Sequence, residues 1–116
     1  MHAFDVLGDP VRRRILELLA HKDAAAGDVA ATIMAEFGIS QAAVSQHLKV
    51  LRDSGFASAR AKGNQRIYAL QPEPMQAVDA WLDQFRHFWM HRMEALATEI
   101  ARGKRQRGIN EKDEPD

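Results

Sequence analysis

The stretch "SQAAVSQHLKVLRDSGF", residues 40–56, decides the fold of this chain. Ser40 is a favourable N-cap and Gly55 a favourable stop, so the stretch predicts a helix over residues 40–54. Apolar side chains recur at the spacing of one helix face, at Val44, Leu48 and Leu51. The opposite face carries hydroxyl, amide and imidazole groups and a single lysine. Most solvated helix faces are built from Glu and Lys, so this face is expected to contact a partner.

A second helix is predicted immediately before this one, over residues 24–37. Gly38 supplies a left-handed stop, and only Ile39 separates it from the cap at Ser40. The apolar row of this helix is expected at Val29, Ile33 and Phe37. Two helices joined by so short a glycine-containing turn are typical of a helix-turn-helix.

Earlier in the chain, Asp9-Pro10 is a helix-start signal, because Asp can cap free N–H groups and Pro fits the first turn. The helix that follows has one apolar face, made by Val11, Ile15, Leu18 and Leu19. Before it, Phe4 and Leu7 predict a short first helix of one or two turns. Three arginines, residues 12–14, form a basic cluster here, and structural ion pairs explain them as well as any ligand does.

After the central helix, the sequence changes to a strand-like period. Residues 56–70 alternate in size and polarity, and Lys62-Gly63-Asn64 lies in the middle. Gly and Asn tolerate positive φ, so the segment predicts a β-hairpin with a basic tip. A hairpin directly after a helix-turn-helix is a wing.

The rest of the chain predicts one long helix, from Met75 to about Arg102, ended by Gly103. Its apolar stripe is too broad and aromatic for an isolated solvated helix, so we expect it to form a homodimer interface, with Phe4 and Leu7 contributing. The stripe consists of Val78, Trp81, Leu82, Phe85, Phe88, Trp89, Met93, Leu96 and Ile100. The residues from 103 to 116 are polar and predict a disordered tail.

The fold class expected is therefore mainly α with a small β-hairpin: a winged helix-turn-helix domain over residues 1–102. The 116 residues include 46% hydrophobic ones, enough for one small core, and no cysteine, which excludes disulfides and thiolate metal sites. No segment is long and apolar enough to cross a membrane, and residues 1–10 do not resemble a signal peptide, so a cytoplasmic location is expected. The net charge is zero, yet residues 40–66 contain five basic side chains and one acid.

This local basic excess and the unusual helix face predict binding to double-stranded DNA. Glutamine can bind adenine through two hydrogen bonds, serine can contact a base or a phosphate, and an alanine methyl can meet a thymine methyl. On the helix the candidate DNA-binding residues are Ser40, Gln41, Ala42, Ser45, Gln46, His47 and Lys49. On the wing, Lys62 and Arg66 are expected to contact phosphates.

These segments resemble the ArsR family of bacterial winged-helix repressors. The resemblance rests on "LGDPVRRRILELL" (residues 7–19), on residues 40–56 and on "KGNQRIYAL" (residues 62–70), and it covers about residues 4–70. It implies a cytoplasmic homodimer, joined through its first and last helices, that represses transcription from partly palindromic operators. Many members release DNA when a metal or an oxidant binds, but "DVAATIMAEF" (residues 28–37) stands where their cysteine motif would lie. The resemblance is to a branch without cysteine metal sites, and it identifies no inducer.

Two alternatives remain open at this stage. The first is a metal-responsive repressor, because carboxylate and imidazole groups recur on one face of the long helix, at Asp83, His87, His91 and Glu94. Intrahelical pairs explain these residues equally well, so no metal or other cofactor is expected. The second is a winged-helix module that binds protein in place of DNA.

Catalysis is not expected, because Ser45 and His47 face different directions and no phosphate loop or nucleophile elbow is present.

Overall fold

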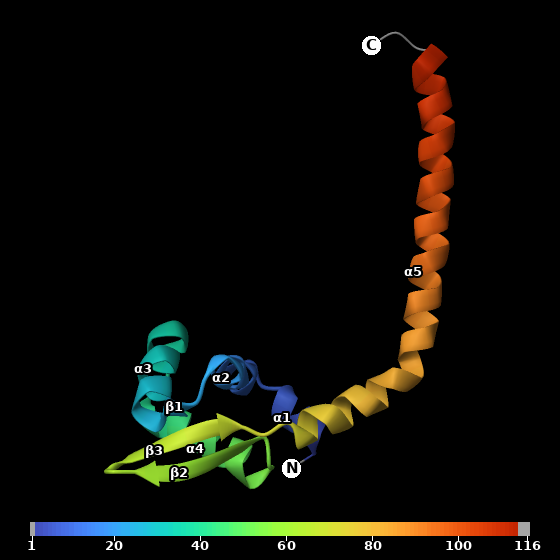
Figure 1. Ribbon diagram of the computed structural model, residues 1–116. Helices are drawn as coiled ribbons and strands as arrows, with labels where there is room; N and C mark the ends of the chain where they lie inside the picture. The colour runs from blue at the N-terminus through green and yellow to red at the C-terminus, as the bar shows by residue number, and fades with distance from the viewer. Residues whose placement is uncertain (1, 114–116) are drawn as a thin grey trace. The chain divides into compact units, whose positions relative to one another are not determined.

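The computed structural model describes the backbone of residues 2–113 and the side chains of residues 2–103. It divides into two compact units, Met1–Asp79 and Ala80–Asp116. The elements, in chain order, are α1 (Ala3–Leu7), α2 (Pro10–His21), β1 (Ala24–Ala25), α3 (Ala26–Phe37), α4 (Gln41–Asp53), β2 (Ala57–Lys62), β3 (Gln65–Leu70) and α5 (Glu73–Asp113). This order confirms the predicted winged helix-turn-helix in the first unit (Figure 1).

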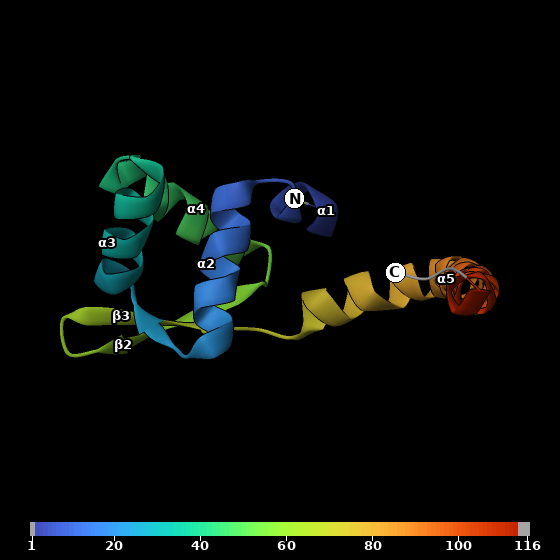
Figure 2. The same ribbon diagram turned by 90° about the horizontal axis from the view of Figure 1, so that it is seen from above.

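The first unit contains a small antiparallel sheet with the strand order β1-β3-β2. Lys62 pairs with Gln65 across the hairpin, so the connecting loop is Gly63-Asn64. Gly63 has φ of 62°, and positive φ at the first loop residue alone is the pattern of a type II′ turn. Seen from above, α2 lies between α3 and α1 (Figure 2), an arrangement that Figure 1 also shows.

The core of this unit joins the apolar faces of α2, α3 and α4 to the sheet. Val44, Leu48 and Leu51 are at most 3% exposed, which confirms the inward row predicted for α4. Other buried core members are Val6, Val11, Ile15, Leu16, Leu19, Val29, Ile33, Phe56 and Tyr68. Burial of this row fixes which face of α4 remains in solvent.

The ends of α4 have the predicted local signals. At the start, Ser40 Oγ accepts a hydrogen bond from the backbone N–H of Ala43 at 3.1 Å. At the end, Gly55 has φ of 80°, and Phe56 N–H donates to the carbonyl of Leu51 at 2.9 Å. With Gly55 N–H donating to Arg52, this is a Schellman motif, and it places Phe56 in the core beside Leu51.

Asp9 caps α2 as predicted. Its Oδ1 accepts from the backbone N–H groups of Val11 at 2.8 Å and of Arg12 at 3.1 Å. Burial raises the pKa of the Asp9 carboxyl, but these hydrogen bonds and the nearby charges of His47 and Arg12 outweigh burial and hold the pKa below its ordinary value.

Asp9→Ala is therefore expected to lower the free energy of unfolding by about 1 kcal/mol at neutral pH, because the cap is lost. A carboxyl with a depressed folded-state pKa stabilises the fold above the unfolded-state pKa, and this contribution disappears as pH falls through the folded-state value. The difference between wild type and variant, measured by urea unfolding, should thus shrink below a pH of about 4. A difference that stays constant down to the acid limit would contradict this assignment.

The structure corrects three sequence-based predictions. The helix predicted from residue 24 begins at Ala26, because Ala24 and Ala25 pair with Tyr68 and Ile67 as strand β1. Phe37 is 38% exposed and lies outside the core row, because it is the last residue of α3. On the buried face of α3, Ala30 joins Val29 and Ile33.

The third correction concerns α5, whose backbone continues through Gly103 to Asp113. The residues after Gly103 include several good helix formers, and each glycine inside a helix, here Gly103 and Gly108, costs only about 1 kcal/mol. The helix end predicted at Gly103 is therefore wrong. The disordered tail predicted for residues 103–116 stays a prediction, and residues 114–116 lie outside the described residues. The domain boundary at 102 stays a prediction.

The second unit consists of α5 residues, and it leaves most of its large apolar side chains exposed. These are Trp81, Phe85, Phe88, Trp89, Met90, Met93, Leu96 and Ile100. Trp81 and Phe85 lie 4.8 Å apart between ring centroids, and the Arg92 guanidinium lies 5.3 Å from the centroid of Phe88. Within the part of the chain that the structure describes, no helix is long and apolar enough to cross a membrane.

Candidate nucleic-acid interface

The exposed face of α4 carries six of the seven residues predicted on it. Ser40, Gln41, Ala42, Ser45, Gln46 and Lys49 are exposed. Among the described residues, no hydrogen bond or ion pair engages the side chains of Gln41, Ser45, Gln46 or Lys49. Their hydrogen-bonding groups are therefore available to a ligand without first breaking a contact inside the protein.

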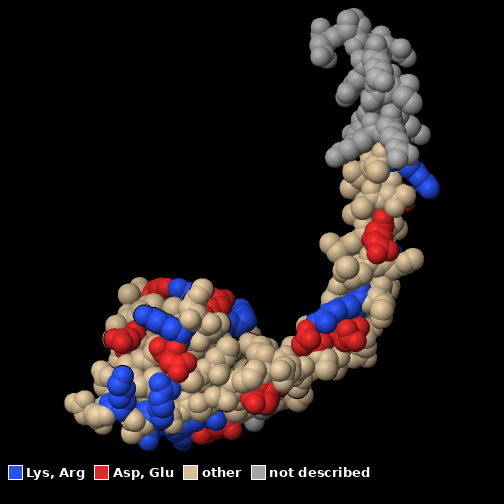
Figure 3. Space-filling view, viewed as in Figure 1, with Lys and Arg blue, Asp and Glu red and all other residues tan. Residues whose placement is uncertain are grey.

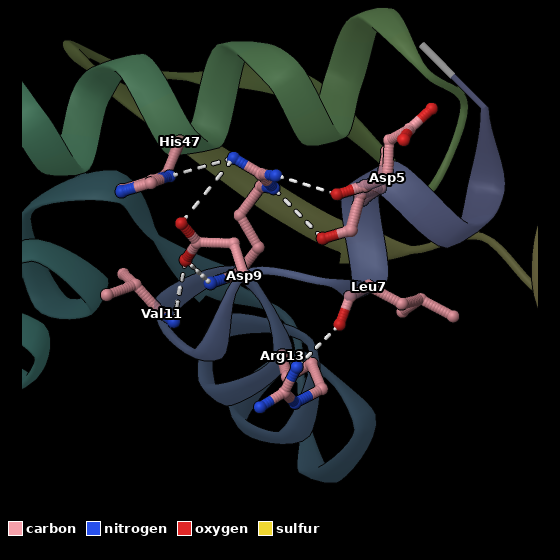
Figure 4. Close-up of polar contacts among 8 residues, drawn as sticks. Asp5, Leu7, Asp9, Val11, Arg13 and His47 are labelled. Carbon is pink, nitrogen blue, oxygen red and sulfur yellow. Dashed lines mark hydrogen bonds and ion pairs between the residues drawn. The ribbon is translucent and has the colours of Figure 1, made fainter.

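His47 differs from the other six because it is half-buried. Its Nδ1 lies 3.4 Å from Nη1 of Arg12, on the side of α4 that faces α1 and α2. Figure 4 shows the ring of His47 turned toward this group of contacts. The structure thus places His47 beside the exposed face of α4, with one ring nitrogen already engaged.

The arginine cluster of residues 12–14 has structural partners. Arg12 donates to the backbone carbonyls of Val6 at 3.0 Å and Asp5 at 2.9 Å, and Arg13 donates to that of Leu7 at 2.7 Å (Figure 4). Both arginines thereby satisfy carbonyls at the end of α1.

Arg14 forms two hydrogen bonds with the carboxylate of Glu36, at 2.9 and 3.0 Å, and so joins α2 to α3. The hydrogen bond from Arg14 also lowers the pKa of Glu36. The contacts of Arg12 with residues 5, 6 and 47 and the contact of Arg14 with Glu36 join different helices, so the sequence pattern could not reveal them.

The hairpin gathers basic side chains, as Figure 3 shows over β2 and β3. Lys62 and Arg66 are exposed near its tip, and no ion pair engages them in the described part of the chain. Arg60, in contrast, pairs with Asp23 at 3.1 Å and so joins the hairpin to the segment before β1. The two cations predicted to contact phosphates are thus the ones that remain uncommitted.

The four weak metal candidates on α5 do not form a site in one chain. Within residues 2–103, no group of three or more His, Cys, Asp or Glu side chains is arranged to hold a metal ion. Asp83 instead accepts from Arg86 at 3.4 Å, one of the intrahelical pairs that the sequence allowed. The metal-responsive alternative therefore gains no support from the geometry.

Comparison with known proteins connects these features to a family. The family described as "Bacterial regulatory protein, arsR family" matches residues 9–59, which run from the cap of α2 into β2. The chain is 40% identical over 83 residues to the HTH-type transcriptional regulator Rv2034 of Mycobacterium tuberculosis, covering 72% of this chain and 74% of that protein. The chain belongs to the ArsR family.

Other ArsR-like proteins extend the similarity. The transcriptional repressor SdpR of Bacillus subtilis is 34% identical over 84 residues, which are 72% of this chain and 89% of that one. A crystal structure described as a possible transcriptional regulator for arsenical resistance superposes with a TM-score of 0.65 at 32% identity, covering 82% of this chain and 95% of that one. These relatives are named as regulators of transcription and not as enzymes, so this ArsR family member is a transcriptional regulator, as the sequence predicted.

Proposed function

We propose that the protein is a homodimeric, sequence-specific DNA-binding repressor that acts in the cytoplasm on a partly palindromic operator. In this proposal α4 enters the major groove, and the β2–β3 hairpin contacts the phosphate backbone. The observation that carries the proposal is the exposed face of α4, where the amides of Gln41 and Gln46 and the hydroxyl of Ser45 have no hydrogen-bond partners within the described residues. The SdpR relative, named as a transcriptional repressor, supports the sign of regulation.

The residues of this interface have different expected roles. Gln41 and Gln46 each offer a donor and an acceptor, as adenine recognition requires, and Ala42 can meet a thymine methyl. Ser40, Ser45 and Lys49 are expected to contact a base edge or a phosphate. Lys62 and Arg66, at the wing, supply backbone contacts that strengthen binding without reading the sequence.

Gln41→Ala and Gln46→Ala are each expected to weaken operator binding by about 1–3 kcal/mol and to relax preference at particular base pairs. The measurement is binding to a library of operators with single base changes. Gln76→Ala is a matched control, because this glutamine is exposed on α5 outside the proposed interface. Unchanged base preference in both α4 variants would remove α4 from base recognition.

Lys62→Ala is expected to weaken binding to operator and random duplexes alike. The dependence of the logarithm of affinity on the logarithm of salt concentration should decrease by about one for each phosphate that the lysine no longer neutralises. Titrations at several salt concentrations measure this slope. If Lys62→Ala changes base preference while the glutamine variants do not, the roles of helix and wing are reversed. A wild-type protein whose weak DNA binding does not respond to salt would favour the protein-binding module.

A homodimer follows from the exposed apolar stripe on α5. Among the side chains of this helix that the structure describes, residues 73–103, eight large apolar ones are exposed in the single chain, and contiguous apolar surface of this kind is typical of a protein interface. Phe4 on α1 is 40% exposed and Leu7 is half-buried, so both are available to contribute. A twofold dimer would present one α4 to each half-site of a palindromic operator.

A further inference from the structure

Arg12 connects three helices through one side chain. Its Nε and Nη2 donate to the carbonyls of Val6 and Asp5 at the end of α1, and Nη1 lies 3.9 Å from Asp9 Oδ2 at the start of α2. The same Nη1 lies 3.4 Å from His47 Nδ1 on α4 (Figure 4). The side chain of Arg12 is only 13% exposed, so it is held inside this junction and is not free to bind DNA.

In a neutral His47, the chemistry of the two side chains selects one tautomer of the imidazole. A guanidinium group donates hydrogen bonds and accepts none, so the nitrogen of His47 that faces Arg12 must be the acceptor. In the neutral ring the proton then lies on Nε2, which Figure 4 shows pointing away from the Arg12 contact. His47 therefore offers a single N–H donor on its remaining free side.

We propose that Arg12 is a positioning residue for DNA binding, which holds His47 so that its Nε2–H donates to a phosphate oxygen of the DNA backbone. This inference rests on the proposed function and adds a role for a residue outside the interface. A ring held against Arg12 stays close to the protein surface, which suits the phosphate backbone better than the floor of the groove. Because Arg12 also holds the end of α1, the same contact ties α4 to a helix of the proposed dimer interface.

The first test is nitrogen-15 NMR of the imidazole of His47 in the full-length protein without DNA, at a pH of about 8, above the ordinary titration range of histidine. The expected result is an unprotonated Nδ1 and a protonated Nε2 in wild type, with a mixture of tautomers in Arg12→Lys. A proton on Nδ1 in wild type would overturn the proposal. This readout needs no DNA, so it is independent of whether the proposed function holds.

The second test compares variants in binding to operator and random duplexes. Arg12→Met and His47→Ala are each expected to lower both affinities by about ten-fold, as expected for one hydrogen bond to a charged group. The double variant should bind no more weakly than the weaker single variant, because both changes remove the same phosphate contact.

Arg13→Met is the matched control, since Arg13 also donates to α1 and carries the same charge but forms no hydrogen bond or ion pair with α4 among the described residues. It should change affinity less than two-fold. Additive effects of Arg12→Met and His47→Ala, or an equal loss in Arg13→Met, would overturn the proposal.

If Arg12→Met does not fold, Arg12→Lys replaces it, because lysine keeps the charge but cannot reach the carbonyls of α1 and His47 together. If wild type lacks salt-dependent DNA binding, the proposed function fails, whatever the tautomer.

Discussion

Trp89→Ala is expected to weaken the homodimer by about 3–5 kcal/mol, which corresponds to between a hundred-fold and a few thousand-fold in the dissociation constant. Trp89 lies near the middle of the α5 stripe and remains 38% exposed in the single chain. A second copy that packs on α5 can cover the rest of the indole, and large aromatic side chains dominate the energetics of such interfaces. Sedimentation equilibrium across a range of protein concentrations measures the change.

His87→Ala is the control for this experiment. Two residues correspond to about 200° of rotation on a helix, so His87 lies on the face opposite Trp89 and should leave dimerisation unchanged. The same variant tests the metal alternative: added zinc should alter operator binding equally little in wild type and His87→Ala. A wild-type protein that is a stable monomer at micromolar concentration would contradict the dimer. Tight stoichiometric zinc binding that releases DNA, and that His87→Ala abolishes, would restore the metal-responsive alternative.

The second large effect is expected in the core of the first unit. Phe56→Ala should lower the free energy of unfolding by about 3–5 kcal/mol, because the removed ring leaves a cavity. Phe56 is 1% exposed and follows the Schellman motif that ends α4, where it packs in the core with Leu51. Losing the ring thus weakens both the core and the end of the proposed reading helix.

Phe37→Ala is the matched control, since the same substitution is made at a residue that is 38% exposed at the end of α3. It should cost clearly less than Phe56→Ala in urea unfolding at one fixed protein concentration. Equal losses in the two variants would mean that Phe56 does not anchor the junction between α4 and β2.

The sequence predicted those elements whose signals are local. The cap at Asp9, the left-handed Gly38 and the cap at Ser40 each act within a few residues, so α2, the end of α3 and the start of α4 follow from the pattern. β1 could not be predicted, because two alanines become a strand only by pairing with Tyr68 and Ile67, which lie more than forty residues later.

In the candidate interface too, local patterns predicted some features, whereas contacts between distant segments could not be predicted. Periodicity identified the buried row of α4 and therefore its outer face, where Gln41 and Gln46 are exposed. It could not show that His47 is engaged by Arg12, because that contact depends on how α1, α2 and α4 pack. The ion pair between Arg60 and Asp23 could not be predicted either, because only the folded hairpin brings these two residues together.

On the proposed operator, we expect α4 to read base edges in the major groove, one copy in each half-site. The most direct measurement is dimethyl sulfate footprinting on a duplex selected from a random library by the wild-type protein, since guanine N7 lies in the major groove. We expect two clusters of protected guanines centred about one helical turn apart, with the protection weakened in Gln46→Ala. Selection of no common sequence, or bound duplexes in which every guanine N7 stays reactive, would contradict it.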